Sequence, residues 1–181
     1  VALTTMDILA ASVWSSEFDL NVEISKVQSL FREDDYEFSP DDIMRMIAIL
    51  LDEEPSSRGL MRLRFRTVLE LRYGFDQLPF TLSEAKSFFK SNLHIPSLKF
   101  VPSKTHLLML VKAFNVLGEM DEGKASLLRR WFWSSGFNED YRNYSDGNLP
   151  KLISAIKVFS DGSIRGFNVR LNIRTDDFLK R

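Results

Sequence analysis

Apolar residues recur along this chain at helical spacing, in short runs that polar or proline-containing breaks separate. Near the start, Met6, Leu9, Ala10, Val13 and Trp14 stand at i, i+3, i+4, i+7 and i+8, the pattern of one helix face. The same spacing predicts further helices at about 19–31, 40–51, 81–89, 103–117, 121–135 and 148–159, and a short final one from 175. No internal repeat is visible, which argues against a solenoid. We therefore predict a mainly α fold, an irregular multi-helix domain of about eight helices within residues 1–181.

Local signals mark several helix ends. Ser39 and Pro40 followed by two aspartates are typical of a helix start, with a capping serine and a proline in the first turn. Thr81 and Glu84 fit a capping box and predict that another helix starts at 81. Gly118 suits the end of the helix over 103–117, because glycine tolerates a left-handed backbone.

Two stretches depart from the helical pattern. Residues 60–66 alternate like a strand, but residues 68–72 do not continue the alternation, and we interpret 60–73 as helical because its surroundings are helical. Residues 163–173 could be extended or irregular.

Composition narrows the class of protein. The chain has 181 residues, of which 44% are hydrophobic and 27% charged, as in an ordinary globular domain. No apolar run reaches the roughly 18 to 20 residues of a membrane helix, and no signal peptide opens the chain. The absence of cysteine excludes disulfides and thiolate metal sites. We expect a cytoplasmic protein, and the valine at position 1 suggests a piece of a longer chain.

The net charge of −1 is the sum of an acidic first part of the chain and a basic remainder. Residues 1–57 hold thirteen acids and three bases, a net −10, whereas residues 58–181 hold twelve acids and twenty-one bases, a net +9. This division indicates either two electrostatic faces or an acidic side that meets a basic partner. The alternative is that an acidic helix pair simply lies beside a basic one.

The sequence shows no readable active site. His94 and His106 are the only histidines, and neither has an acid or a second histidine three or four residues away, so a structural or surface role is favoured over metal ligation. No phosphate-binding glycine loop is present. The pairs Asp41-Asp42 and Asp176-Asp177 stand at predicted helix starts, where capping explains them, and only Asp34-Asp35 lies elsewhere. We predict no catalytic or metal-binding residue and no cofactor for this portion.

One candidate nucleic-acid contact is a cluster of arginines. Five lie within fifteen residues, and Arg62, Arg64 and Arg66 are the candidates at its centre, flanked by Arg58 and Arg72. Guanidinium groups bind phosphate with two parallel hydrogen bonds. The alternative, which we favour from the sequence, is that these arginines pair with the acidic segment 1–57.

A second candidate contact combines two arginines with an indole. On a helix, Arg129, Arg130 and Trp133 fall opposite Leu127, Leu128 and Trp131, so Trp133 could stack on an exposed base while the arginines bind phosphate. The alternative, again favoured, is that Trp133 packs against a neighbouring helix.

Three segments resemble the GmrS-type family of bacterial modification-dependent restriction and phage-defence proteins (GmrSD). Residues 127–141, LLRRWFWSSGFNEDY, resemble its signature L-x-x-W-F-W-x-x-x-F-x-x-x-Y. Residues 99–110, KFVPSKTHLLML, look like its stretch k-f-l-P-y-x-x-q-l-x-x-L, with Ser103 and His106 replacing tyrosine and glutamine. Residues 1–9, VALTTMDIL, look like t-P-L-s-x-x-D-l-L, which follows an R-x-N-x-G-G string in the family.

The resemblance implies a place within a larger protein. The family's N-terminal ParB-like domain carries an Asp-Gly-Gln-Gln-Arg motif associated with nucleotide-dependent nuclease activity, and an HNH-type nuclease domain or subunit often accompanies it. Neither motif occurs here, so the resemblance implies that this chain is the helical portion that follows the ParB-like domain. Nucleotide and Mg²⁺ are implied for the full-length member, and no family catalytic residue can be carried over.

These observations lead to two functional hypotheses. The first is a non-catalytic helical scaffold that contacts DNA within a restriction or phage-defence protein, with the ParB-like domain and the nuclease as partners. The second is a protein–protein interaction module that forms a homo-oligomer or docks a partner without nucleic-acid contact. We expect no membrane association in either case.

Overall fold

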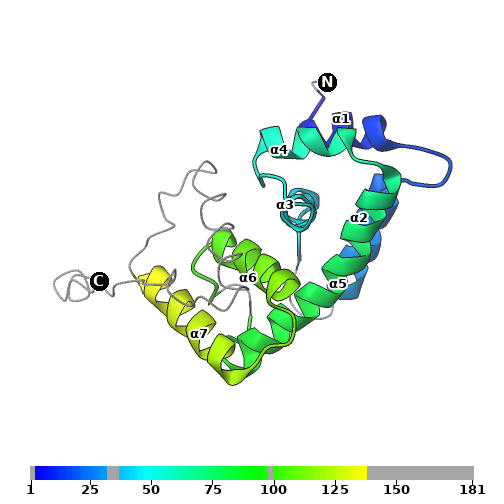
Figure 1. Ribbon diagram of the computed structural model, residues 1–181. Coiled ribbons are helices and arrows are strands. Elements are labelled where there is room, and N and C mark those ends of the chain that lie inside the picture. Colours follow the sequence, from blue (N-terminus) through cyan, green and yellow to red (C-terminus); the bar gives the residue numbers. More distant parts are fainter. Residues whose placement is uncertain (1–2, 32–36, 98–99, 138–181) are drawn as a thin grey trace, which may run out of the picture.

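The computed structural model describes residues 3–31, 37–97 and 100–137, and all regular structure in these residues is helical (Figure 1). The predicted mainly α fold is confirmed. The elements in order are α1 (Thr5–Val13), α2 (Leu20–Phe31), α3 (Pro40–Leu50), α4 (Ser57–Arg62), the 3₁₀ turn η2 (Leu63–Phe65), α5 (Val68–Ser91), α6 (Lys104–Leu117) and α7 (Glu122–Phe137). The predicted helices at 148–159 and from 175, the segment 163–173 and the pairs Asp34-Asp35 and Asp176-Asp177 lie outside the described residues.

Capping boxes start three of the helices. The hydroxyls of Thr4, Ser39 and Thr67 accept from the backbone N–H three residues later, and the carboxylate at that later position binds back to the cap. This exchange satisfies backbone donors that a helix start otherwise leaves unpaired. The start predicted at Ser39 and Pro40 is confirmed.

The helix start predicted at Thr81 is wrong. α5 runs unbroken from Val68 to Ser91, through Pro79, and its capping box lies at Thr67 and Glu70. The Thr81 hydroxyl is buried and donates to the carbonyls of Gln77 and Leu78, one turn earlier in the same helix. Buried residues at helical spacing on both sides of Pro79 keep the helix continuous: Leu71, Phe75, Leu78, Leu82 and Ala85.

The ambiguous stretch 60–73 is helical on both sides of one extended break. α4 and η2 end before Arg66, whose backbone is extended (φ −77°, ψ 147°), and α5 begins at Val68. The chain therefore changes direction at Arg66 and Thr67, between α4 and α5. The sequence pattern predicts a single helix over this stretch.

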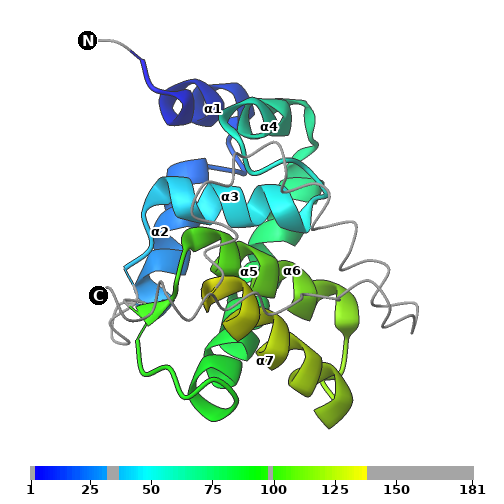
Figure 2. The same cartoon turned by 90° about the vertical axis from the view of Figure 1, so that its left-hand side faces the viewer.

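The core lies where α3, α5 and α6 pack against one another. Seven of the eleven residues of α3 are buried, as are ten of the fourteen residues of α6. α3 crosses α5 and α6, α1 and α4 lie side by side at one end, and α7 lies at the other (Figures 1 and 2). Burial of this apolar surface is the main source of stability.

A buried lysine joins α6 to the end of α3. Lys112 is only 2% exposed, and its Nζ donates to the carbonyl of Ile49 at 3.1 Å and to Oδ1 of Asp52 at 2.9 Å. Asp52 has a left-handed backbone (φ 61°) just after the helix. A cation at a helix C-terminus is favourable, because the last carbonyls carry partial negative charge.

Candidate nucleic-acid interface

The first arginine cluster occupies the corner formed by α4, η2 and the start of α5. Ser56 caps α4 by accepting from the N–H of Gly59 at 3.1 Å, and Thr67 caps α5. The corner contains Arg62, Arg64 and Arg66, the three candidate residues of the first cluster, with Arg58 at the start of α4. We call Arg58, Arg62, Arg64 and Phe65 the arginine corner.

Arg66 is held within the protein. Its guanidinium donates to Oε1 of Glu53 at 2.8 Å, to Oε1 of Glu70 at 3.0 Å and to the carbonyl of Leu51 at 3.1 Å. The hydrogen bonds to Glu53 and Glu70 raise the pKa of Arg66. The backbone hydrogen bond from Thr67 and the contact with Arg66 lower the pKa of Glu70. Arg66 therefore fixes the geometry of the corner and engages the nearby acids.

The three arginines of the arginine corner, unlike Arg66, face solvent. Arg62 approaches Glu53 only loosely, at 3.8 Å, and is exposed. Arg64 is exposed and places its guanidinium 4.5 Å from the centroid of the Phe65 ring, a cation–π distance. Within the described residues, neither Arg58 nor Arg64 has a carboxylate partner. The corner thus presents three exposed arginines, and the guanidinium group of Arg64 lies beside the Phe65 ring, which is 74% exposed.

Some of the five clustered arginines contact the acidic segment 1–57, which was the alternative to nucleic-acid contact. Arg62 and Arg66 meet Glu53 of that segment, and Arg72 donates to the backbone carbonyl of Glu17. Of the described residues, Arg58 and Arg64 are the members of the cluster that make no such contact.

The second candidate contact lies in α7, at the opposite end of the fold from the arginine corner (Figure 1). Trp133 is half-buried and packs against the core, with its ring perpendicular to that of Phe132 at a centroid distance of 5.4 Å. Arg129 lies 3.4 Å from Glu122, and Arg130 is exposed. Trp133 therefore packs against the core, and Arg129 and Arg130 form the second of the two candidate contacts.

His106 forms a buried hydrogen-bonded network that the sequence did not reveal. Its Nδ1 lies 2.9 Å from Oγ of Ser103, and its Nε2 lies 3.0 Å from Oγ of Ser135. Ser135 donates to the carbonyl of Trp131, so its oxygen accepts from Nε2–H, and Nδ1 accepts from Ser103. Burial lowers the pKa of His106 to about 4. The neutral ring joins α6 to α7, as its predicted structural role requires, whereas His94 is exposed.

We expect this histidine to make the protein acid-sensitive. The unfolded chain takes up the proton near the ordinary pKa of 6.5 and the folded chain only near 4. The free energy of unfolding therefore keeps its full value above about pH 6.5 and falls by about 2–3 kcal/mol as the pH is lowered to about 4. Urea unfolding at several pH values measures this loss. In His106→Phe, which cannot take up the proton, the loss between pH 7 and pH 4 should be smaller by that amount, and an identical loss in both proteins would contradict the assignment.

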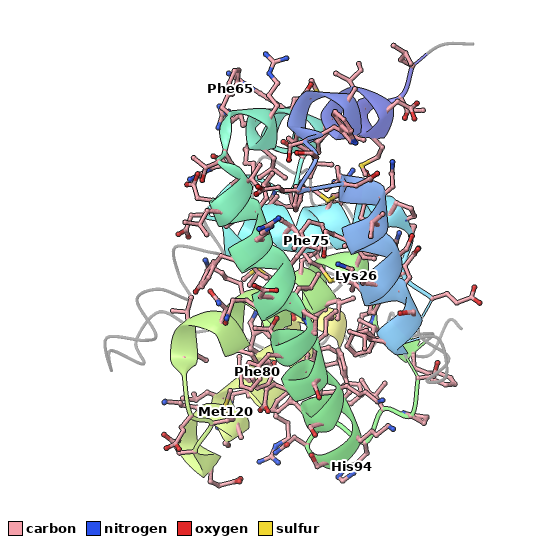
Figure 3. All side chains as sticks on the ribbon, turned by 90° about the vertical axis from the view of Figure 1, so that its right-hand side faces the viewer. Lys26, Phe65, Phe75, Phe80, His94 and Met120 are labelled. Carbon is pink, nitrogen blue, oxygen red and sulfur yellow. The ribbon has the colours of Figure 1, made fainter. Side chains whose placement is uncertain are left out.

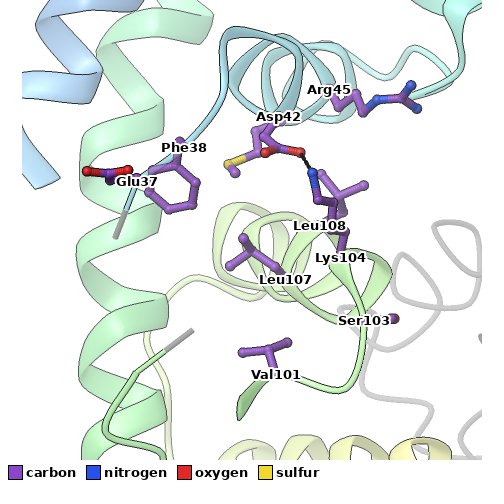
Figure 4. A pocket seen from close by; sticks show the side chains of 10 residues that line it. Glu37, Phe38, Asp42, Arg45, Val101, Ser103, Lys104, Leu107 and Leu108 are labelled. Atoms are coloured by element: carbon purple, nitrogen blue, oxygen red, sulfur yellow. Dashed lines mark hydrogen bonds and ion pairs between the residues drawn. The ribbon is translucent and has the colours of Figure 1, made fainter. Parts of the chain in front are cut away.

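A groove of about 200 Å³ lies between the first turns of α3 and α6 (Figure 4). Its floor is apolar and includes Phe38, Leu107 and Leu108. At its edge Asp42 meets Nζ of Lys104 at 2.6 Å. Burial raises the pKa of Asp42, but hydrogen bonds from Lys104 and Ser39 outweigh it and lower the pKa.

The acids of the described residues do not gather into a metal site. Asp42 is engaged by Ser39 and Lys104, and Asp41 by Arg45 at 2.6 Å. Within residues 3–31, 37–97 and 100–137, no three histidine or acidic side chains lie close enough to hold a metal ion. The capping explanation of Asp41-Asp42 agrees with this geometry.

Neither a membrane-spanning helix among the described residues nor a known relative points to the function of this chain. None of the described helices is both long and apolar enough to cross a bilayer. No family model, no curated protein and no solved structure matches the chain.

Proposed function

We propose that this chain is a helical module that contacts the nucleic-acid backbone, and that it serves as a non-catalytic scaffold in a DNA-targeting protein like those of the GmrS-type family. The observation that carries the proposal is the arginine corner, where Arg58, Arg62 and Arg64 are exposed and Arg64 lies against an exposed phenylalanine, Phe65. In such a protein the nucleotide, Mg²⁺ and the cleavage chemistry belong to a ParB-like domain and an HNH-type nuclease.

The electrostatics of the arginine corner support phosphate binding. Arg66 already engages Glu53 and Glu70, so these acids neutralise the outer guanidinium groups less. A phosphate can accept two parallel hydrogen bonds from one guanidinium group. Phe65 is 74% exposed although Arg64 lies over its ring, so part of the ring is accessible to an unstacked base. Aromatic rings bind single-stranded bases by stacking.

Fluorescence anisotropy with a labelled oligonucleotide tests the proposal. Replacing Arg62 and Arg64 with alanine should weaken binding at least about tenfold at low salt, since each phosphate contact adds to affinity through counterion release. The matched control replaces Arg129 and Arg130 and should bind like the wild type. Loss of binding in the control alone would move the interface to α7, and unchanged binding in both would refute nucleic-acid contact by either cluster.

The non-catalytic role makes a separate prediction. With Mg²⁺ and each nucleoside triphosphate, the purified chain should neither hydrolyse nucleotide nor cleave DNA. Cleavage that persists through repeated purification would overturn the scaffold role without bearing on the arginine corner.

A further inference from the structure

The solvent face of α5 carries large apolar side chains in a regular line. Leu69 is 78% exposed, Tyr73 53% and Phe80 62%. At 3.6 residues per turn, these three and Asp76 fall within a sector of about 60°, opposite the buried face of the helix. Figure 3 looks onto α5 and α2, with Phe80 on α5 and Phe65 just before its start. We call Leu69, Tyr73, Asp76 and Phe80 the α5 seam.

The spacing of the α5 seam is that of a helix pair. Its members are four, three and four residues apart, the alternation that keeps one face turned toward a partner helix. The core-facing residues of α5 already pack against α3 and α6 within the chain, and Phe75 lies against Phe18. The α5 seam lies on the opposite side of the helix from these contacts, so α3, α6 and Phe18 leave its side chains exposed.

We propose that two copies of this chain pair through the α5 seam, with their α5 helices antiparallel. A two-fold axis that crosses the helix between Tyr73 and Asp76 places Leu69 opposite Phe80 of the second copy. The same register places Asp76 opposite Tyr73 of the second copy and beside its Arg72, whose guanidinium group also donates to the Glu17 carbonyl of its own chain. A phenol and a guanidinium group both donate to carboxylate, so each Asp76 meets two donors.

The charges of the seam favour this orientation. In a parallel pair each residue meets its own counterpart, so two Asp76 carboxylates and two Arg72 guanidinium groups would face each other, which is unfavourable. An antiparallel pair instead matches opposite charges and opposes the two helix dipoles. This self-complementarity is why we assign a second copy to the surface. The pairing is independent of the nucleic-acid contact, which uses the arginine corner.

Light scattering after size exclusion, without nucleic acid, is the first test. The wild type should rise from the monomer mass of 21.0 kDa toward twice that value as its concentration increases. Phe80→Glu should stay monomeric with an unchanged helical circular dichroism spectrum. The matched control is Leu30→Glu, a side chain 60% exposed on α2, and it should pair like the wild type. A wild type that stays monomeric at all concentrations, or a Phe80→Glu variant that still pairs, would overturn the proposal.

A charge exchange tests the antiparallel register directly. Arg72→Glu and Asp76→Arg should each weaken pairing at least about tenfold, because each places like charges across the seam twice. In an equimolar mixture, the two variants should pair as well as the wild type, since both cross-seam contacts then join opposite charges. A mixture that pairs no better than either variant alone would rule out this register, whatever the result with nucleic acid.

Discussion

Replacing Lys112 with alanine is expected to lower the free energy of unfolding by about 3–5 kcal/mol. The ammonium group is buried and binds the Ile49 carbonyl and Asp52, and the four-carbon stem fills space in the core. The variant loses hydrogen bonds made by a charged group, about 1.5–3 kcal/mol, and leaves a cavity where the stem was. Urea unfolding at neutral pH measures the change.

A second variant separates the two contributions. Lys112→Met keeps most of the stem and removes only the charge, so it should lose about 1.5–3 kcal/mol. Lys90→Ala, at an exposed lysine near the end of α5, should change stability by less than about 0.5 kcal/mol. If Lys112→Met were as stable as the wild type, the lysine would fill space without holding the end of α3.

Gly59→Ala is expected to cost at least about 3 kcal/mol, or to prevent folding. A Cβ built on Gly59 would lie 1.8 Å from the carbonyl oxygen of Glu54, so the backbone must move. Overpacking in a close contact costs about 1–3 kcal/mol, and a clash with backbone exceeds this range because no rotamer change relieves it. The displaced segment includes Glu53, the partner of Arg66, so the arginine corner should be disturbed as well. Thermal unfolding followed by circular dichroism gives the size of the loss.

Gly123 provides the matched control. It lies in the first turn of α7, and a Cβ there would meet only the side-chain Oδ1 of Asp121, at 3.1 Å. Because alanine favours a helix over glycine by up to about 1 kcal/mol, Gly123→Ala should be neutral or slightly stabilising. Equal destabilisation by the two substitutions would show that the close approach at Gly59 is not the cause.

Much of the fold could be predicted from local patterns. The cap at Ser39 and the stripes of α2, α3 and α6 are set by residues close in sequence, so periodicity identifies them. The same rules failed at Thr81, because a threonine followed by glutamate three residues later is a cap only where the residue before it has left the helical conformation, as Arg66 has before Thr67. Nothing local distinguishes Thr81 from Thr67, which is the cap that α5 uses.

The candidate site was predictable in its residue types but not in its contacts. Five arginines close in sequence indicated a basic cluster, yet only the folded chain shows that Arg66 is engaged internally while Arg58 and Arg64 remain accessible. Lys112 and His106 depend on partners far away in sequence, Ile49 and Ser135. A lysine within the apolar run LLMLVKAF is the one signal that could have indicated a buried charge.

Nucleic-acid contact at the arginine corner and pairing through the α5 seam are compatible with each other. The arginine corner lies just before α5, and the α5 seam runs along the same helix from Leu69 to Phe80. Antiparallel pairing would place one arginine corner next to each end of the paired α5 seams, so that two phosphate contacts could act on one nucleic acid. Linked contacts of this kind raise the apparent affinity without any new interaction.

The salt dependence of nucleic-acid binding tests the central claim most directly. For each arginine that contacts phosphate, the slope of log affinity against log salt changes by about 0.9 on duplex DNA. Measured side by side with the wild type, the variant lacking the Arg62 and Arg64 guanidinium groups should show a slope shallower by about 2 for each chain bound. An unchanged slope, or a wild type whose binding does not depend on salt, would contradict a phosphate contact at the arginine corner.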